Sequence, residues 1–114
     1  GHNFVDANLI YHAKRQSEVC RAVANSRRLI ILWMLTKEEL SVNEIAGRVG
    51  SSLQNISQHL RLLRKTGIVG ARRSGQTIYY HIIDHEFLRE CPALLGAPER
   101  TQLNQITKRI KKEQ

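Results

Sequence analysis

Apolar residues recur every three or four positions through the first third of the chain, the spacing that gives a helix one buried face. Residues 7–24 predict the first helix. Its stripe consists of Leu9, Ala13, Gln16, Cys20 and Val23, with the glutamine as one polar interruption. Residues 27–36 are apolar on nearly every side, which is typical of a central buried helix, and Ser26 is the expected N-cap.

Two capped helices separated by a glycine turn come next. Ser41 and Glu44 have the spacing of a capping box, in which each side chain accepts from the other residue's backbone amide. The box predicts a short helix that ends near Arg48. Gly50 marks the turn, and the second helix should extend to about Lys65. This order predicts a helix-turn-helix, whose second helix enters the major groove of DNA.

The second of these helices separates an apolar face from a polar one. The run Ser51-Ser52-Leu53-Gln54 offers its N-cap, and Gly67 is its C-terminal stop. The inward stripe is Leu53, Ile56, Leu60 and Leu63. The outward positions are Gln54, Asn55, Ser57, Gln58, His59, Arg61 and Arg64. Amides can pair with adenine, arginine with guanine and serine with phosphate, so these residues and Ser52 are candidate DNA contacts; a solvated polar helix is the alternative.

The period of the pattern changes from about 3.6 to 2 after Gly67. Residues 68–73 and 76–82 alternate around Ser74-Gly75 and predict a β-hairpin. Its polar end carries four further candidate DNA contacts: Arg72, Arg73, Gln76 and Thr77. They could follow the DNA backbone or enter the minor groove, although charge on an edge hairpin also protects it from aggregation.

A fifth helix is predicted after the hairpin, with Asp84 as its N-cap. Its apolar face carries Phe87, Leu88, Cys91 and Leu94, and Pro92 must kink or restart it. With Gly1-His2 set aside as a cloning scar, residues 3–96 should form one mainly α domain with a small β-hairpin. Residues 97–114 form a basic tail that is either helical or frayed.

Positive charge is concentrated where DNA contact is predicted. The net charge is +8 and the pI is about 10.1, which favours an anionic partner. No carboxylate occurs between Ile45 and Ile83, a segment that holds six Lys and Arg residues. An ordinary solvated surface normally mixes both signs, so nucleic acid is the favoured partner.

The composition also bears on location and assembly. The longest apolar run, Leu29–Leu35, is too short to span a bilayer, so we expect a cytoplasmic protein with no membrane partner. Aromatic residues make up only 5% of the chain, and a small core of this kind often gains stability from a second subunit.

Taken in order, the motifs resemble the ArsR/SmtB family of bacterial winged-helix repressors, over about Val19 to Asp84. They are Ala24-Asn25-Ser26-Arg27-Arg28-Leu29, Ser57-Gln58-His59-Leu60 with Leu63-Arg64 and Gly67, and Arg72-Arg73 with Gly75 and Tyr79-Tyr80. The resemblance implies a homodimer through the first and fifth helices that binds an inverted repeat and is released by an inducer. The apolar residues expected at that interface are Leu9, Phe87, Leu88 and Leu94.

Neither metal-binding pattern of the family is present. Metalloid-sensing relatives carry Cys-x-Cys where this chain has Ser41-Val42-Asn43, and zinc-sensing relatives carry a His-x-x-Glu where this chain has Ala97 and Arg100. We therefore expect no metal and no cofactor. An irregular site is the alternative, and it would use His81, Asp84, His85 and Glu90.

An oxidant or a reactive sulfur species is the other kind of inducer that the resemblance suggests. Some relatives sense oxidants or reactive sulfur with one cysteine on the second helix and one on the fifth, and the second-helix position here is Trp33. Cys20 and Cys91 could replace that pair, because the first and fifth helices adjoin in the family. Inert packing is the alternative, since both lie on apolar stripes.

Three classes of function remain to be compared. A sequence-specific repressor is favoured. The alternative is a nucleic-acid or protein adaptor that uses the predicted hairpin of residues 68–82, the wing, without reading bases and without an inducer. An enzyme is not expected, because no phosphate-loop or nucleophile motif occurs and Ser57 and His59 point to different helix faces.

Overall fold

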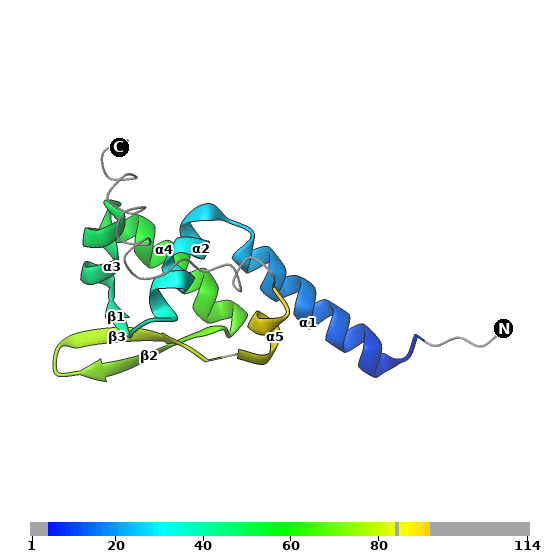
Figure 1. Ribbon diagram of the computed structural model, residues 1–114. Helices are drawn as coiled ribbons and strands as arrows, with labels where there is room; N and C mark the ends of the chain where they lie inside the picture. The colour runs from blue at the N-terminus through cyan, green and yellow to red at the C-terminus, as the bar shows by residue number, and fades with distance from the viewer. Residues whose placement is uncertain (1–4, 84, 92–114) are drawn as a thin grey trace.

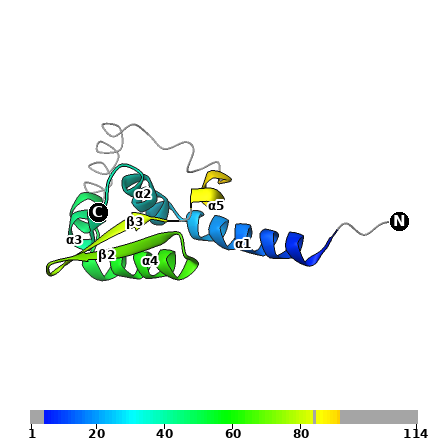
Figure 2. The ribbon, with the colours of Figure 1, turned by 90° about the horizontal axis from the view of Figure 1, so that it is seen from below.

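Five helices and three short strands make up the part of the chain that the computed structural model describes, residues 5–83 and 85–91 (Figure 1). In chain order they are α1 (Ala7–Val23), α2 (Ser26–Leu35), β1 (Leu40–Ser41), α3 (Val42–Val49), α4 (Leu53–Thr66), β2 (Val69–Ser74), β3 (Thr77–Ile82) and α5 (His85–Arg89). The hairpin tip and the N-terminal end of α1 lie at opposite ends of the molecule (Figures 1 and 2). This arrangement confirms the predicted winged helix-turn-helix fold.

Side-chain caps fix where the helices start. Ser41 and Glu44 form the predicted capping box, with bonds of 3.0 and 3.2 Å to each other's backbone amides. Of the two serines in the run that offered a cap for α4, Ser52 is the N-cap: its hydroxyl accepts from the amide of Asn55 at 3.1 Å. The prediction for α2 was wrong by one residue, because Asn25 is the extended residue whose side chain accepts from a helix amide, and Ser26 is already helical.

Glycines in the left-handed conformation end both helices of the helix-turn-helix. Gly50 has φ of 76° and follows α3, while Gly67 has φ of 87° and follows α4. A side chain at either position would strain the backbone, so these glycines fix where α3 and α4 end.

The core lies among α1, α2, α3 and α4, and the sheet closes one side. Its largest fully buried side chains include Ile31, Leu32, Leu40, Ile45, Ile56, Leu60, Leu63, Ile68 and Leu88. Leu53 was predicted to face inward, yet its side chain is 50% exposed. It is the first residue of α4, and the buried residues of this helix begin only at Ile56.

The sheet has the strand order β1-β3-β2, and all neighbours are antiparallel. The hairpin pairs Val69 with Ile82 at its base and Ser74 with Thr77 at its tip. Strand β1 was not predicted, because two residues show no periodicity; Leu40 and Ser41 pair with Tyr80 and Tyr79. The hairpin of β2 and β3, which is the wing of this fold, is therefore paired through β3 with the two residues that directly precede α3.

The predicted fifth helix is present but short. It ends at Arg89, so Cys91 lies just beyond it and not on its face. The expected cap Asp84, Leu94 and the tail of residues 97–114 lie outside the described residues. Among the helices that the structure does describe, none has the length and apolar character needed to cross a membrane.

Candidate nucleic-acid interface

The solvent-facing side of α4 gathers the predicted DNA contacts. Gln54, Ser57, Gln58, Arg61 and Arg64 are all exposed. Between α4 and the wing lies a surface hollow of about 560 Å³. Its walls are Ser57, Arg61, Arg64, Lys65 and Tyr80. The hollow therefore combines three cations with hydroxyl groups, a combination suited to an anionic phosphate group.

Asn55 and His59 lie in less open positions than the sequence pattern predicts. The Asn55 amide donates to the Ser51 hydroxyl at 3.0 Å, so it braces the first turn of α4. His59 is half-buried, and burial, followed by the charges of Arg28 and Arg27, lowers the pKa of its imidazole. Its ring is therefore neutral near pH 7, and it does not add a positive charge to this face.

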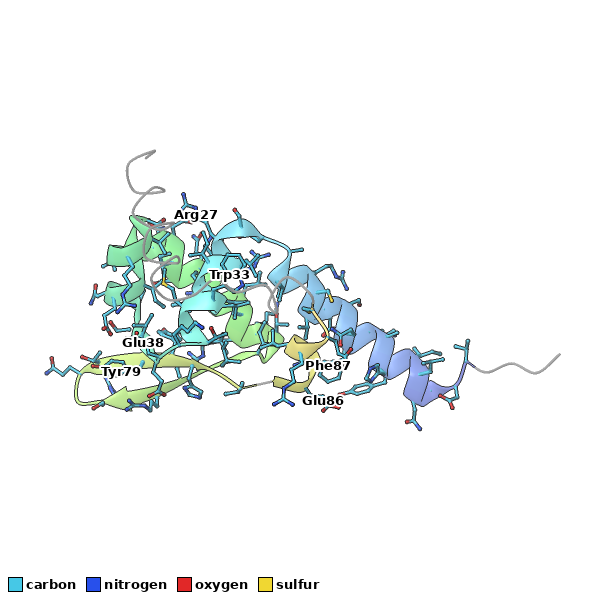
Figure 3. The ribbon with its side chains drawn as sticks, in the orientation of Figure 1. Arg27, Trp33, Glu38, Tyr79, Glu86 and Phe87 are labelled. Atoms are coloured by element: carbon cyan, nitrogen blue, oxygen red, sulfur yellow. The ribbon has the colours of Figure 1, made fainter. Side chains whose placement is uncertain are left out.

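The wing presents its polar residues at two levels. Arg73, Gln76 and Thr77 are exposed near the tip. Arg72 is held closer to the body, because its guanidinium binds the Glu39 carboxylate at 2.8 Å and lies 5.1 Å from the centre of the Tyr79 ring. Tyr79 lies on the hairpin, well separated from Phe87 of α5 (Figure 3). Arg73 is thus the wing arginine whose side chain points to solvent without a carboxylate partner among the described ion pairs.

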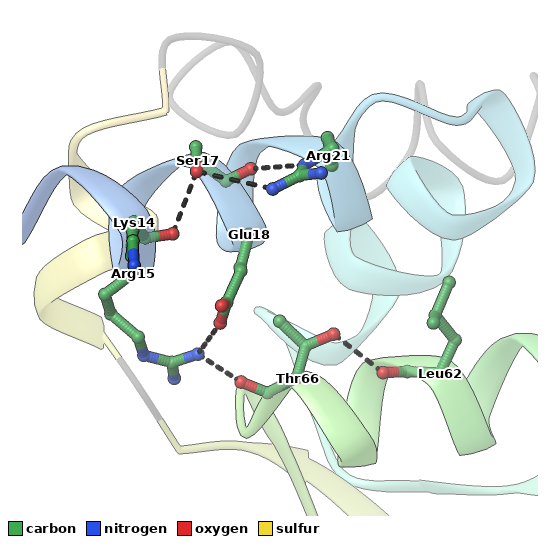
Figure 4. Close-up of polar contacts among 7 residues, drawn as sticks. All are labelled: Lys14, Arg15, Ser17, Glu18, Arg21, Leu62 and Thr66. Atoms are coloured by element: carbon green, nitrogen blue, oxygen red, sulfur yellow. Dashed lines mark hydrogen bonds and ion pairs between the residues drawn. The ribbon is translucent and has the colours of Figure 1, made fainter. Parts of the chain in front are cut away.

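A contact that the sequence did not reveal joins α1 to the end of α4. The Arg15 guanidinium donates to the backbone carbonyl of Thr66 (Figure 4). The Glu18 carboxylate lies 3.8 Å from the same guanidinium. The same guanidinium lies 5.5 Å from the centre of the Phe87 ring. A cation at the C-terminus of a helix also meets the negative end of its dipole. Arg15 therefore links α1, α4 and α5 at one point.

The two cysteines are brought together. Their Sγ atoms are 3.4 Å apart, with Cys20 exposed and Cys91 buried. The Gln16 amide lies beside both and donates to the Phe87 carbonyl at 3.1 Å. Burial, and next the hydrogen bond with Cys20, raises the pKa of the Cys91 thiol to about 11.

The residues expected at a dimer interface fall into different places. Leu9 is 48% exposed, on the end of α1 where Val5, Ile10 and Tyr11 are also exposed. Phe87 is half-buried. Leu88 is only 1% exposed because it fills the protomer's own core, so it is not available as an interface residue, and Leu94 lies outside the described residues. The candidate interface is therefore the exposed N-terminal part of α1.

Metal ligands do not converge in the described part of the chain. Within residues 5–83 and 85–91, no group of three or more His, Cys, Asp or Glu side chains has a geometry that could hold a metal ion. Asp84, one member of the irregular set considered above, lies outside those residues.

Comparison with known proteins gives the same class as the geometry. The helix-turn-helix domain family matches residues 23–69. The transcriptional activator HlyU of Vibrio cholerae is 46% identical over 66 residues, 58% of this chain and 61% of the relative. The crystal structure of NolR from Sinorhizobium fredii matches with a TM-score of 0.68 and 35% identity, over 82% of this chain and 93% of that one.

A third relative bears on assembly. The homodimeric winged helix-turn-helix DNA-binding domain of Mb0332 from Mycobacterium bovis, described as a possible ArsR-family regulator, matches with a TM-score of 0.68 and 32% identity. The match covers 78% of this chain and 82% of that one. The chain spans about half to three-fifths of the length of three curated relatives that it matches, HlyU among them.

Fold, exposed basic face and relatives together define a winged helix-turn-helix DNA-binding domain of the kind found in transcriptional regulators. The chain belongs to the ArsR/SmtB family of winged helix-turn-helix regulators.

Proposed function

We propose that two copies of this chain bind an inverted-repeat operator and repress transcription. The observation that carries the proposal is the exposed side of α4, on which amides, hydroxyls and arginines gather without a carboxylate. A helix of this kind fits the major groove, and a dimer reads two equivalent half-sites.

The side chains divide into two groups by what they can contact. Gln54 and Gln58 are exposed amides and are assigned to base edges. Phosphate contacts are assigned to Ser52, Ser57, Arg61, Arg64, Arg73, Gln76 and Thr77. Asn55, His59 and Arg72 have partners or burial within the protomer, so we assign them first to holding this surface in place.

Binding should be selective and sensitive to salt. Because each protomer displaces counterions from phosphates, the affinity for a palindromic duplex selected from random sequences should fall steeply as salt rises. Fluorescence anisotropy at several salt concentrations measures this, with a scrambled duplex of equal composition as the control. Equal affinity for both duplexes at moderate salt would favour the adaptor that does not read sequence.

Two single substitutions should separate base reading from backbone contact. Gln58→Ala should relax preference at one base position by about 1 to 3 kcal/mol, since it removes a bidentate contact. Arg73→Ala should weaken all duplexes by a similar factor. Selection of binding sites with each variant checks this assignment, which is reversed if Arg73→Ala alters the selected sequence and Gln58→Ala does not.

We also propose that a thiol reaction releases the operator. The support is the 3.4 Å separation of the Cys20 and Cys91 sulfur atoms, from which a disulfide of about 2.05 Å needs only a small movement. Inert packing is the competing account, and the raised pKa of Cys91 agrees with it.

DNA affinity before and after oxidation decides between these accounts. Treatment with hydrogen peroxide, followed by mass determination under non-reducing conditions, should yield a Cys20–Cys91 disulfide and reduce operator affinity at least tenfold. The variants Cys20→Ser and Cys91→Ser should keep full affinity after the same treatment. A parent protein that forms the disulfide yet keeps its affinity, or a response that survives loss of both thiols, would leave the cysteines as packing.

A further inference from the structure

An apolar pocket of about 310 Å³ opens beside the thiol pair, between the end of α1 and the start of α2. It is lined by Cys20, Val23, Ala24, Asn25, Ser26, Leu29 and Cys91. None of these side chains carries a formal charge, and Asn25 and Ser26 supply the polar groups. Its size lies within the range of small-molecule sites, in which apolar walls hold the body of a ligand and a few polar groups orient it.

We propose that this pocket makes organic hydroperoxides, with an alkyl or aryl body, the preferred oxidants of the Cys20–Cys91 pair. The inference rests on the thiol switch proposed above and names its substrate class. An apolar body can leave water by packing on Val23 and Leu29, which places its O–O bond beside the sulfur atoms. Hydrogen peroxide has no such body and gains nothing from these walls.

The difference in solvent exposure between the two thiols indicates which of them reacts first. Cys20 is exposed and reacts first, whereas Cys91 is buried and keeps its proton at neutral pH. The Cys20 thiolate attacks the terminal oxygen of the hydroperoxide, the O–O bond breaks, and the alkoxide leaves and takes up the former Cys20 proton as an alcohol. Cys20 is now a sulfenic acid.

The second step closes the disulfide. The Cys91 sulfur attacks the Cys20 sulfur, the S–O bond breaks, and hydroxide leaves with the Cys91 proton as water. The two thiols lose two electrons in total and the hydroperoxide gains them, so one hydroperoxide gives one disulfide, one alcohol and one water. The initial Sγ separation of 3.4 Å allows this closure without a change of fold.

The test compares cumene hydroperoxide with hydrogen peroxide on the full chain. The readout is the second-order rate constant of Cys20–Cys91 disulfide formation, followed by non-reducing mass spectrometry, with each reagent normalised to its rate with free cysteine. We expect the normalised ratio of cumene hydroperoxide to hydrogen peroxide to be at least 10. Leu29→Gln, which makes one wall polar, should reduce that ratio about fivefold and leave the hydrogen peroxide rate unchanged.

A matched variant controls for a general effect of the substitution. Leu62→Gln changes a partly exposed leucine that does not line this pocket, and it should keep the parental ratio. A normalised ratio near 1 in the parent, or a ratio that Leu29→Gln leaves unchanged, overturns the pocket assignment while the thiol switch stands. If neither reagent forms the disulfide, the thiol switch fails and this inference fails with it.

Discussion

Replacing Leu9 with aspartate is expected to give a folded monomer, whereas the same replacement at Leu88 is expected to destabilise the fold strongly and lower its melting temperature. Leu9 is 48% exposed on the projecting end of α1, where a charge remains solvated, so the free energy of unfolding should change by less than about 0.5 kcal/mol. Leu88 is 1% exposed, and an unpaired carboxylate there should cost on the order of 4 kcal/mol or more. Small domains are stable by only about 5 to 15 kcal/mol, so this loss is large.

Sedimentation equilibrium and thermal unfolding followed by circular dichroism measure the two effects separately. Ile78→Asp is the control, because Ile78 is also an exposed apolar residue, at 42%, but lies on the wing. It should remain dimeric. If Leu9→Asp sediments as a dimer, subunits associate through another surface, and if Leu88→Asp keeps the parental melting temperature, the core assignment of Leu88 is wrong.

Removing Arg61 and Arg64 together is expected to reduce operator affinity by about 100- to 1,000-fold at physiological salt. Both guanidinium groups line the hollow between α4 and the wing, so a dimer would lose four phosphate contacts. The slope of log affinity against log salt should become shallower by about 3.6, since each contact contributes about 0.9.

A variant with the same net charge separates local contact from bulk attraction. Lys14→Ala with Arg21→Ala removes two exposed cations from α1, outside the hollow. It should change affinity by less than about threefold, because exposed charges beyond a Debye length are largely screened. An equal loss in both double variants would show that net charge, and not the α4 surface, governs binding.

Local chemistry explains which parts of the fold the sequence predicted. The Ser41 and Glu44 capping box and the turn glycines act over three or four residues, and each was found where expected; the cap of α4 was found within the predicted run 51–54, at Ser52. Leu53 was placed wrongly because periodicity describes a face and does not show where the neighbouring helices end. Strand β1 was missed because its two residues gain their pairing from β3, far along the chain.

Contacts between distant segments explain what the sequence left open in the site. The pattern found the polar face of α4, but it could not show that Asn55 binds Ser51 or that Glu39 holds Arg72. Nor could it measure the separation of Cys20 and Cys91, which depends on how the segment after α5 returns to α1. Arg15 gave no signal at all, since an arginine at this spacing also suits an ordinary solvated helix.

The Arg15 junction has a thermodynamic consequence under the redox control proposed above. Arg15 joins the helix that carries Cys20 to the last residue of α4, the helix proposed to contact DNA. If oxidation weakens operator binding by some factor, reciprocity requires the operator to disfavour disulfide formation by the same factor. A tenfold effect corresponds to a rise of about 30 mV in the reduction potential of the disulfide. Protein bound to the operator would then be oxidised last, and unbound protein would consume oxidant before it.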